Sequence, residues 1–184
     1  MLRLLFILAT SFYSLTNLSA QQVAYTAHDG QISFASEAPL ELIQAKSQKL
    51  SGIVDIDKGS FAFSVPIRSL KGFNSPLQQE HFNENYMESD LYPNATFSGK
   101  LIDPIDVTKP GLYPIRAKGM LNVHGVKMER IIKGSVQVKP GSLDLKAEFV
   151  VLLNDHQIQI PKIVYQKIAE EINVKLQIVL LPKL

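Results

Sequence analysis

The chain has 184 residues, a formal net charge of +2 at pH 7 and no cysteine. Its length suits one domain that is large enough to bury a hydrophobic core. The lack of cysteine excludes disulfides, thiol catalysis and metal sites with cysteine ligands. The near-neutral charge argues against nucleic acid as a partner, because nucleic-acid binding requires a clustered basic surface.

Residues 1–20 have the pattern of a secretory signal peptide. Arg3 precedes an apolar run from Leu4 to Tyr13, and small or polar residues then lead to Ala20. The apolar run is shorter than the roughly 20 residues that span a bilayer. We therefore expect cleavage after Ala20, which removes one arginine and no acid, so that residues 21–184 form an exported domain of charge +1. Its expected location is the periplasm or the cell exterior.

Alternating apolar and polar residues predict antiparallel strands along most of the chain. The clearest run places Phe61, Phe63 and Val65 in phase, and side chains two residues apart in a strand share one face. About eight or nine short strands joined by tight turns indicate an all-β barrel or sandwich. Turns are predicted at His28-Asp29-Gly30, Asp57-Lys58-Gly59 and Pro140-Gly141, the first of them between two separate strands.

One helix is predicted in the middle of the chain, over residues 76–86. Ser75 has the character of an N-cap, Pro76 suits the first helical position and Gln78 completes a capping box. Phe82 and Tyr86 are four residues apart, so both can pack on the sheet from one face of the helix. The run over residues 163–170 is compatible with a second short helix.

Several local patterns occur together and in order along residues 21–184. They are Tyr92-Pro-Asn-Ala-Thr-Phe-Ser-Gly99, Gly119-Met-Leu-Asn-Val-His-Gly-Val126, Asp155-His-Gln-Ile and an alternating closing strand. Together they resemble the YceI-like family of exported, lipocalin-like barrels that bind polyisoprenoids. The chain departs from the family at Asn122 and Lys127, where many members have threonine. It also departs at His81-Phe-Asn-Glu-Asn-Tyr86, so the resemblance does not identify the ligand.

The resemblance implies an antiparallel eight-stranded lipocalin-like barrel that holds an isoprenoid or a similar long apolar lipid. Such barrels either hold one small ligand or fill their interior with side chains, so a packed interior is the alternative. Alternation leaves open which face points inward, because Val150 and Leu152 are as apolar as their neighbours. The residues predicted to line the cavity are Phe34, Phe61, Phe63, Val65, Phe97, Leu121, Val123, Phe149, Val151, Leu176 and Ile178.

The polar segment 79–99 is expected to cover one end of the barrel and to serve as its entrance. The residues predicted at this entrance are His81, Phe82, Tyr86, Tyr92 and His124. For His124 two roles are open. It either forms a hydrogen bond with a loop carbonyl, which we favour, or lines the mouth and meets a polar headgroup.

Other chemistry has weaker support in the sequence. His81 with Glu80, Glu84 and Glu88 could bind a metal, although carboxylates on an exposed helix are usually solvated. The sequence has no nucleophile elbow, zinc motif or glycine-rich phosphate loop. We therefore expect a non-enzymatic lipid binder in transient contact with membranes, with no cofactor apart from the bound lipid. The alternatives are a packed barrel that serves protein interaction or a stress response, and a metal-binding protein.

The free energy of removing a lipid chain from water indicates what kind of binder this would be. A chain of ~40 carbons gains roughly 30 kcal/mol on leaving water, at about 0.8 kcal/mol per methylene. Non-covalent affinities saturate near about 20 kcal/mol, so such a lipid is never free in water. The protein would have to compete with a membrane, and it would act as a carrier or reservoir.

Overall fold

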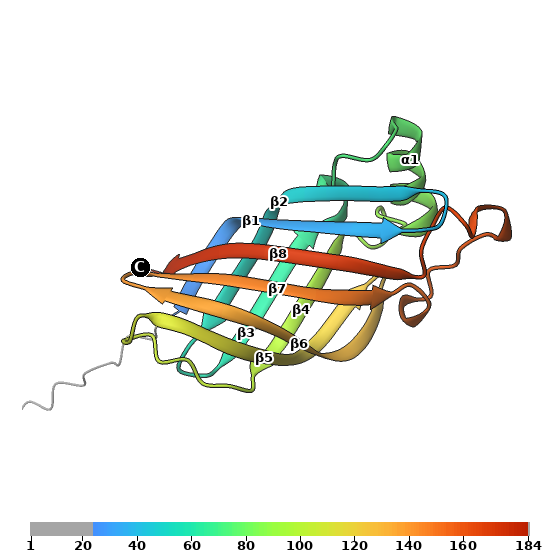
Figure 1. Cartoon of the computed structure of the whole chain (residues 1–184). Coiled ribbons are helices and arrows are strands. Elements are labelled where there is room, and N and C mark those ends of the chain that lie inside the picture. The colour runs from blue at the N-terminus through green and yellow to red at the C-terminus, as the bar shows by residue number, and fades with distance from the viewer. Residues whose placement is uncertain (1–23, 184) are drawn as a thin grey trace, which may run out of the picture.

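The computed structural model describes residues 24–183, and the predicted signal peptide lies outside them. Eight antiparallel strands pair in sequence order and close into a barrel (Figure 1). The prediction of an eight-stranded antiparallel barrel is thereby confirmed. The strands are β1 (Ala24–Glu37), β2 (Leu42–Asp55), β3 (Ser60–Pro66), β4 (Asn94–Leu101), β5 (Gly111–Val123), β6 (Val126–Lys139), β7 (Ser142–Leu152) and β8 (Glu171–Pro182).

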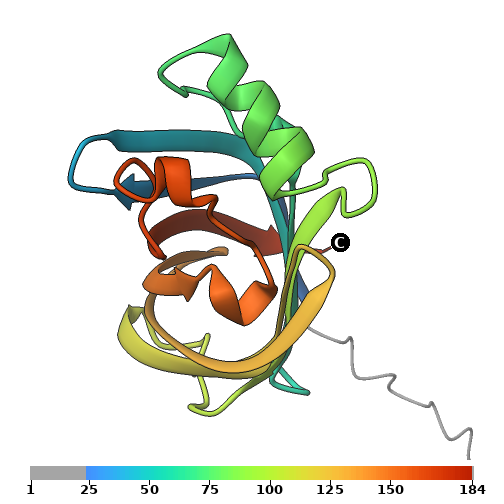
Figure 2. The same cartoon turned by 90° about the vertical axis from the view of Figure 1, so that its right-hand side faces the viewer.

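The two ends of the barrel differ in what covers them. At one end, which we call the closed end, the connections are short except for residues 102–110, whose Ile105 and Val107 pack against the core. The opposite end, which we call the mouth, carries helix α1 (Pro76–His81) and the long connection between β7 and β8 (Figures 1 and 2). The connections at the mouth are residues 38–41, 67–93, 124–125 and 153–170.

Strand β1 corrects the prediction of a turn at His28-Asp29-Gly30. The strand runs through these residues without interruption, and its pairing with β2 shifts register between Ala27 and Gly30 and again between Gly30 and Ile32. The segment is therefore a β-bulge, which bends a strand without ending it. Glycine is needed here because a Cβ on Gly30 would lie 2.7 Å from Cγ1 of Ile178.

The helix at the mouth covers residues 76–86, as predicted. It begins as α1, and Oγ of Ser75 accepts a hydrogen bond from the backbone N–H of Gln78 at 3.1 Å. From Phe82 to Tyr86 it continues as a π-helix, and the N–H of Met87 donates to the carbonyl of Phe82 at 2.9 Å. We call the whole element the mouth helix. Figure 2 shows it lying across one side of the barrel opening.

The predicted second helix, over residues 163–170, is wrong. The segment contains one 3-10 turn, Lys162–Val164, followed by further turns. No side chain caps its start, and the β-branched residues Ile163 and Val164 lose rotamer freedom in a helix. The backbone bonds that remain are short-range, as from Lys167 N–H to the carbonyl of Val164 at 2.8 Å. This segment, residues 160–168, is called the mouth loop below.

Two strand pairs separate toward the mouth. Strand β2 pairs with β3 only over residues 51–55, and β6 pairs with β7 only over residues 134–139. Beyond these stretches the seams are bridged by other groups. Lys46 and Lys71 exchange backbone hydrogen bonds, and the guanidinium of Arg130 donates to the carbonyl of Val150 at 3.0 Å. The barrel is thus opened along two seams near the mouth, which both pair near the closed end.

Candidate ligand-binding cavity

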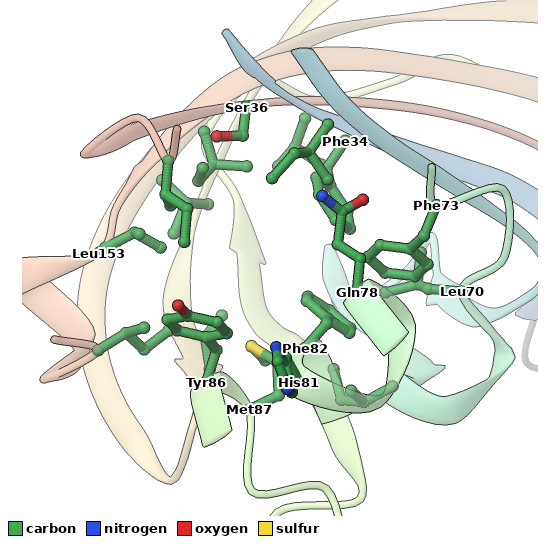
Figure 3. A pocket seen from close by; sticks show the side chains of 18 of the residues that line it. Phe34, Ser36, Leu70, Phe73, Gln78, His81, Phe82, Tyr86, Met87 and Leu153 are labelled. Atoms are coloured by element: carbon green, nitrogen blue, oxygen red, sulfur yellow. The ribbon is translucent and has the colours of Figure 1, made fainter. Parts of the chain in front are cut away.

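The mouth end of the barrel encloses a cavity of about 360 Å³ (Figure 3). Its wall is formed by inward-facing strand residues such as Phe34, Val123 and Val151, and by Phe82 and Tyr86 of the mouth helix. Volumes of about 300–1,000 Å³ are usual for small-molecule sites. The mouth end therefore has the size and the apolar surface of a ligand-binding cavity.

A second void, of about 90 Å³, lies deeper in the barrel and is lined by Phe61, Phe63 and Phe97. These rings contact one another, with centroids 4.9 Å apart for Phe61 and Phe97 and 5.9 Å apart for Phe61 and Phe63. We call these three phenylalanines the aromatic floor. Both cavities share the lining residues Ile32, Val65, Ala95, Leu121 and Phe149, which therefore form the neck between them.

Apart from this small void, the closed end of the barrel is filled with side chains, some of which line the void. Leu143, Ile178 and Leu180 are among the most buried side chains, each 1% exposed. They belong to one apolar cluster with Tyr25, Leu50 and Val54. The two alternatives that the sequence left open thus apply to different parts of one barrel, which is hollow at the mouth and packed at the closed end.

Aromatic contacts fasten the mouth helix to the barrel wall. Phe82 stacks on Phe34 of β1, with ring centroids 5.4 Å apart and an interplanar angle of 21°. Phe73, which the sequence analysis did not select, lies 4.9 Å from Phe82 and 6.0 Å from Phe34 (Figure 3). A large apolar residue in an otherwise polar connection was the feature of the sequence that could have identified Phe73. These contacts confirm the prediction that Phe82 packs the helix on the sheet.

Polar groups at the cavity gather near its opening. Gln78 and Glu41 both line it, and Nε2 of Gln78 donates to Oε1 of Glu41 at 2.8 Å. His81 and Lys167 also contribute to the lining. Tyr86 is partly buried, and this burial raises the pKa of its phenol. The arrangement can accept an apolar chain in the interior and a polar group at the opening.

His124 and Tyr92 lie beside the mouth, outside the cavity wall. His124 and Gly125 form the two-residue turn between β5 and β6, with φ of 52° and 73°, as a type I′ hairpin turn requires. Nδ1 of His124 is 3.1 Å from the carbonyl oxygen of His156, and its Nε2 is 2.6 Å from Oε2 of Glu88. Both partners of the ring, the carbonyl oxygen and the carboxylate oxygen, are acceptors. His124 therefore joins a loop carbonyl, which was the favoured role.

His156 completes this polar junction beneath the loop that follows β7. It is 1% exposed, and its Nδ1 lies 3.1 Å from the carbonyl oxygen of Val126. Burial lowers the pKa of its imidazole, and this effect exceeds the opposing effect of its hydrogen bond with Val126. The neutral ring therefore ties the β7–β8 connection to the start of β6.

Ten of the eleven residues predicted to line a cavity lie on the wall of one of the two voids, and Ile178 does not. Ile178 points inward but packs in the filled half, so it has no free space beside it. On β7 the inward face carries Phe149 and Val151, which resolves the ambiguity of that strand. Lining residues from the connections were missed because their sequences show no periodicity, among them Ile67, Leu70, Met87, Ile158 and Ile168.

Within residues 24–183 there is no group of three or more histidine, aspartate or glutamate side chains that could hold a metal ion. In the same range, no helix is both long and apolar enough to cross a membrane. The carboxylates of the mouth helix that the sequence suggested as ligands, Glu80 and Glu84, are exposed.

Residues 20–180 match the family model of the YceI-like domain. A polyisoprenoid-binding domain from Saccharophagus degradans, implicated in plant cell wall breakdown, has a similar structure, with a TM-score of 0.73 and 14% identity over 89% of this chain and 100% of that one. Burkholderia cenocepacia BcnA has a TM-score of 0.68 and 14% identity over 82% and 95% of the two chains.

A YceI protein from Campylobacter jejuni is more distant, with a TM-score of 0.53 and 13% identity over 96% of this chain and 94% of that one. A search of curated protein sequences finds no match. The solved structures agree with the eight-stranded barrel, and the family model covers nearly the whole described chain. The chain belongs to the YceI-like family.

Proposed function

We propose that this protein is a non-catalytic carrier that holds the apolar chain of a lipid, such as an isoprenoid, inside the cavity at the mouth. The observation that carries the proposal is the apolar cavity of about 360 Å³ between the mouth helix and the barrel wall. The similarity to a polyisoprenoid-binding domain gives further support. An apolar wall suits the burial of a chain and offers few groups that could stabilise developing charge.

The polar groups at the opening give the proposed ligand an orientation. Gln78, Glu41, His81 and Lys167 line the cavity near the mouth, whereas its inner end meets the aromatic floor. A lipid would therefore enter tail first and leave its polar head among these side chains. This orientation avoids the cost of burying an unpaired polar group.

We also propose that the carrier is exported and exchanges its lipid with a bilayer at the mouth. The N-terminal sequence supports export to the periplasm or the exterior. The mouth loop presents Ile163 and Tyr165 to solvent, 92% and 64% exposed, and carries Lys162 and Lys167. Apolar and aromatic residues beside lysines suit a membrane interface with anionic lipids. Leu40 lies next to this loop, since its N–H donates to the carbonyl of Gln166 at 2.9 Å.

Extraction of the purified protein tests lipid binding. We expect native mass spectrometry to find a lipid bound at one per chain, and organic extraction to release it. If no lipid copurifies and added prenyl alcohols do not bind, the proposal fails.

A matched pair of variants separates cavity binding from adsorption on the surface. Val123→Glu places a charge on the cavity wall, whereas Met120→Glu places it on the outward face of the same strand. We expect the first variant to lose the lipid and the second to keep it, with both barrels folded by circular dichroism. Equal retention in the two would contradict binding inside the barrel.

Vesicle flotation tests the exchange at the mouth. We expect the protein to float with vesicles that contain anionic lipid, and the variant Ile163→Asp/Tyr165→Asp to stay in solution. Flotation of the double variant equal to that of the parent protein would contradict contact through the mouth loop.

A further inference from the structure

We propose that the cavity selects lipids by chain length: it buries about 14 carbons, up to about 18 if the void at the aromatic floor is also filled. This inference rests on the proposed lipid binding and adds a specificity to it. The length limit comes from the aromatic floor and the packed half below it. A longer chain can bind only with its remainder outside the barrel.

The volumes set the number of carbons. An apolar protein cavity of about 150 Å³ holds benzene, which corresponds to roughly 25 Å³ for each carbon. The main cavity of about 360 Å³ then holds about 14 carbons. The deeper void of about 90 Å³ adds three or four at the same roughly 25 Å³ each. A chain of ~40 carbons exceeds this space more than twofold.

The aromatic floor is fixed by what lies around it. Phe63 lies directly over Gly52 of β2, where an added Cβ would be 2.3 Å from its ring. Phe61 is buried, and its ring contacts the rings of Phe63 and Phe97. Leu143 and Leu180, which are almost fully buried, line the deeper void together with these rings, so the free space at the floor is this void of about 90 Å³. A tail that reaches the floor therefore stops.

The neck provides a second control on length. Five strands contribute one residue each to both cavities, and Ala95 has the smallest side chain of the five. It is partly buried on β4, directly opposite Val65 of β3 in the pairing. A large side chain at this position would close the passage between the two voids and leave the main cavity in place.

Competition among prenyl alcohols of 10, 15, 20 and 40 carbons tests the inference. The protein, stripped of endogenous lipid, is mixed with equal amounts of the four in dilute detergent, and the bound species are counted by native mass spectrometry. Burial of each further methylene raises affinity by about fourfold. We therefore expect the 15-carbon alcohol to exceed the 10-carbon one strongly, the 20-carbon alcohol to gain only what the deeper void can still bury, and the 40-carbon alcohol to gain nothing over the 20-carbon one.

Variants at the floor and at the neck should move the preferred length in opposite directions. Phe97→Ala enlarges the deeper void and should increase the advantage of the 20-carbon alcohol over the 15-carbon one. Ala95→Phe closes the neck and should remove that advantage. Met120→Ala, on the outward face of β5, is the matched control, and it should leave the preferred length unchanged.

The outcomes separate the two proposals. If no alcohol binds, lipid binding itself fails. If the parent protein binds the 40-carbon alcohol at least tenfold better than the 20-carbon one, lipid binding stands and the length limit is overturned. If Phe97→Ala and Ala95→Phe both fold, as judged by circular dichroism, and neither moves the preferred length, the assignment of the limit to the floor and neck is overturned.

Discussion

The two halves of this barrel are built from the same eight strands, yet one is packed and the other hollow. At the closed end β6, β7 and β8 pair without interruption, and side chains such as Leu143 and Ile178 fill the interior. At the mouth, two seams separate and the connections supply much of the wall. Strand pairing at one end thus provides stability and leaves the other end free to form a binding site.

The largest difference is expected for truncation of an inward-facing isoleucine in each half. Ile178→Ala removes a side chain that is 1% exposed in the packed half, and it should lower the free energy of unfolding by about 2–5 kcal/mol. Ile172→Ala, on the same face of β8 but at the main cavity, enlarges a space that already exists. It should cost about half as much. Urea unfolding of both variants measures the difference, and equal losses would contradict a packed lower half.

An intermediate effect is expected at the mouth helix. Phe82→Ala removes the stacking on Phe34 and the contact with Phe73, worth about 1–2 kcal/mol together with the lost burial. Because these contacts hold the helix and not the strands, the loss should appear as faster hydrogen exchange in residues 76–86. The amides of β8 should keep their protection. A matching loss of protection across the barrel would mean that the helix and the core unfold as one unit.

The smallest expected effect is the pH dependence contributed by His156. Burial lowers the pKa of this imidazole in the folded chain, so below about pH 6.5 the unfolded chain binds a proton that the folded chain does not. Stability should therefore fall as the pH drops from about 6.5 through the folded-state pKa, by about 1.4 kcal/mol per unit of pKa lowering.

His156→Gln is the control for this pH dependence, since its amide can donate to Val126 without titrating. Unfolding measured between pH 5 and pH 8 should show a shallower loss for this variant. An unchanged profile would assign the acid sensitivity to other groups.

Much of the fold was predictable because local patterns have direct structural causes. Alternation placed Phe61, Phe63 and Val65 on one face of a strand, and Ser75 with Pro76 marked the start of the helix. The His28-Asp29-Gly30 segment failed as a turn, because its glycine serves the close approach of Ile178. This contact lies between β1 and β8, which are far apart in the sequence, so a local sequence pattern cannot predict it.

Many of the residues that line the candidate cavity were predictable from the sequence, but the size and limits of the cavity were not. Alternation shows which side chains share a face, but which face points inward, and whether the inward side chains meet, depend on the complete barrel. Ile178 and Val174 follow the same rule on β8, yet only Val174 lines the main cavity. The wall residues Ile158 and Ile168 come from an irregular connection, where only the complete fold brings them to the mouth.

Isoleucine methyl NMR during titration with the 15-carbon prenyl alcohol tests most directly whether the hollow half is the binding site. Ile158, Ile168 and Ile172 line the main cavity, whereas Ile178 lies in the packed half and Ile56 beyond β2 at the closed end. We predict large, saturable shifts for the first three methyl groups and little change for the other two. Shifts of equal size at Ile178 and Ile56, or none at the cavity methyl groups, would contradict it.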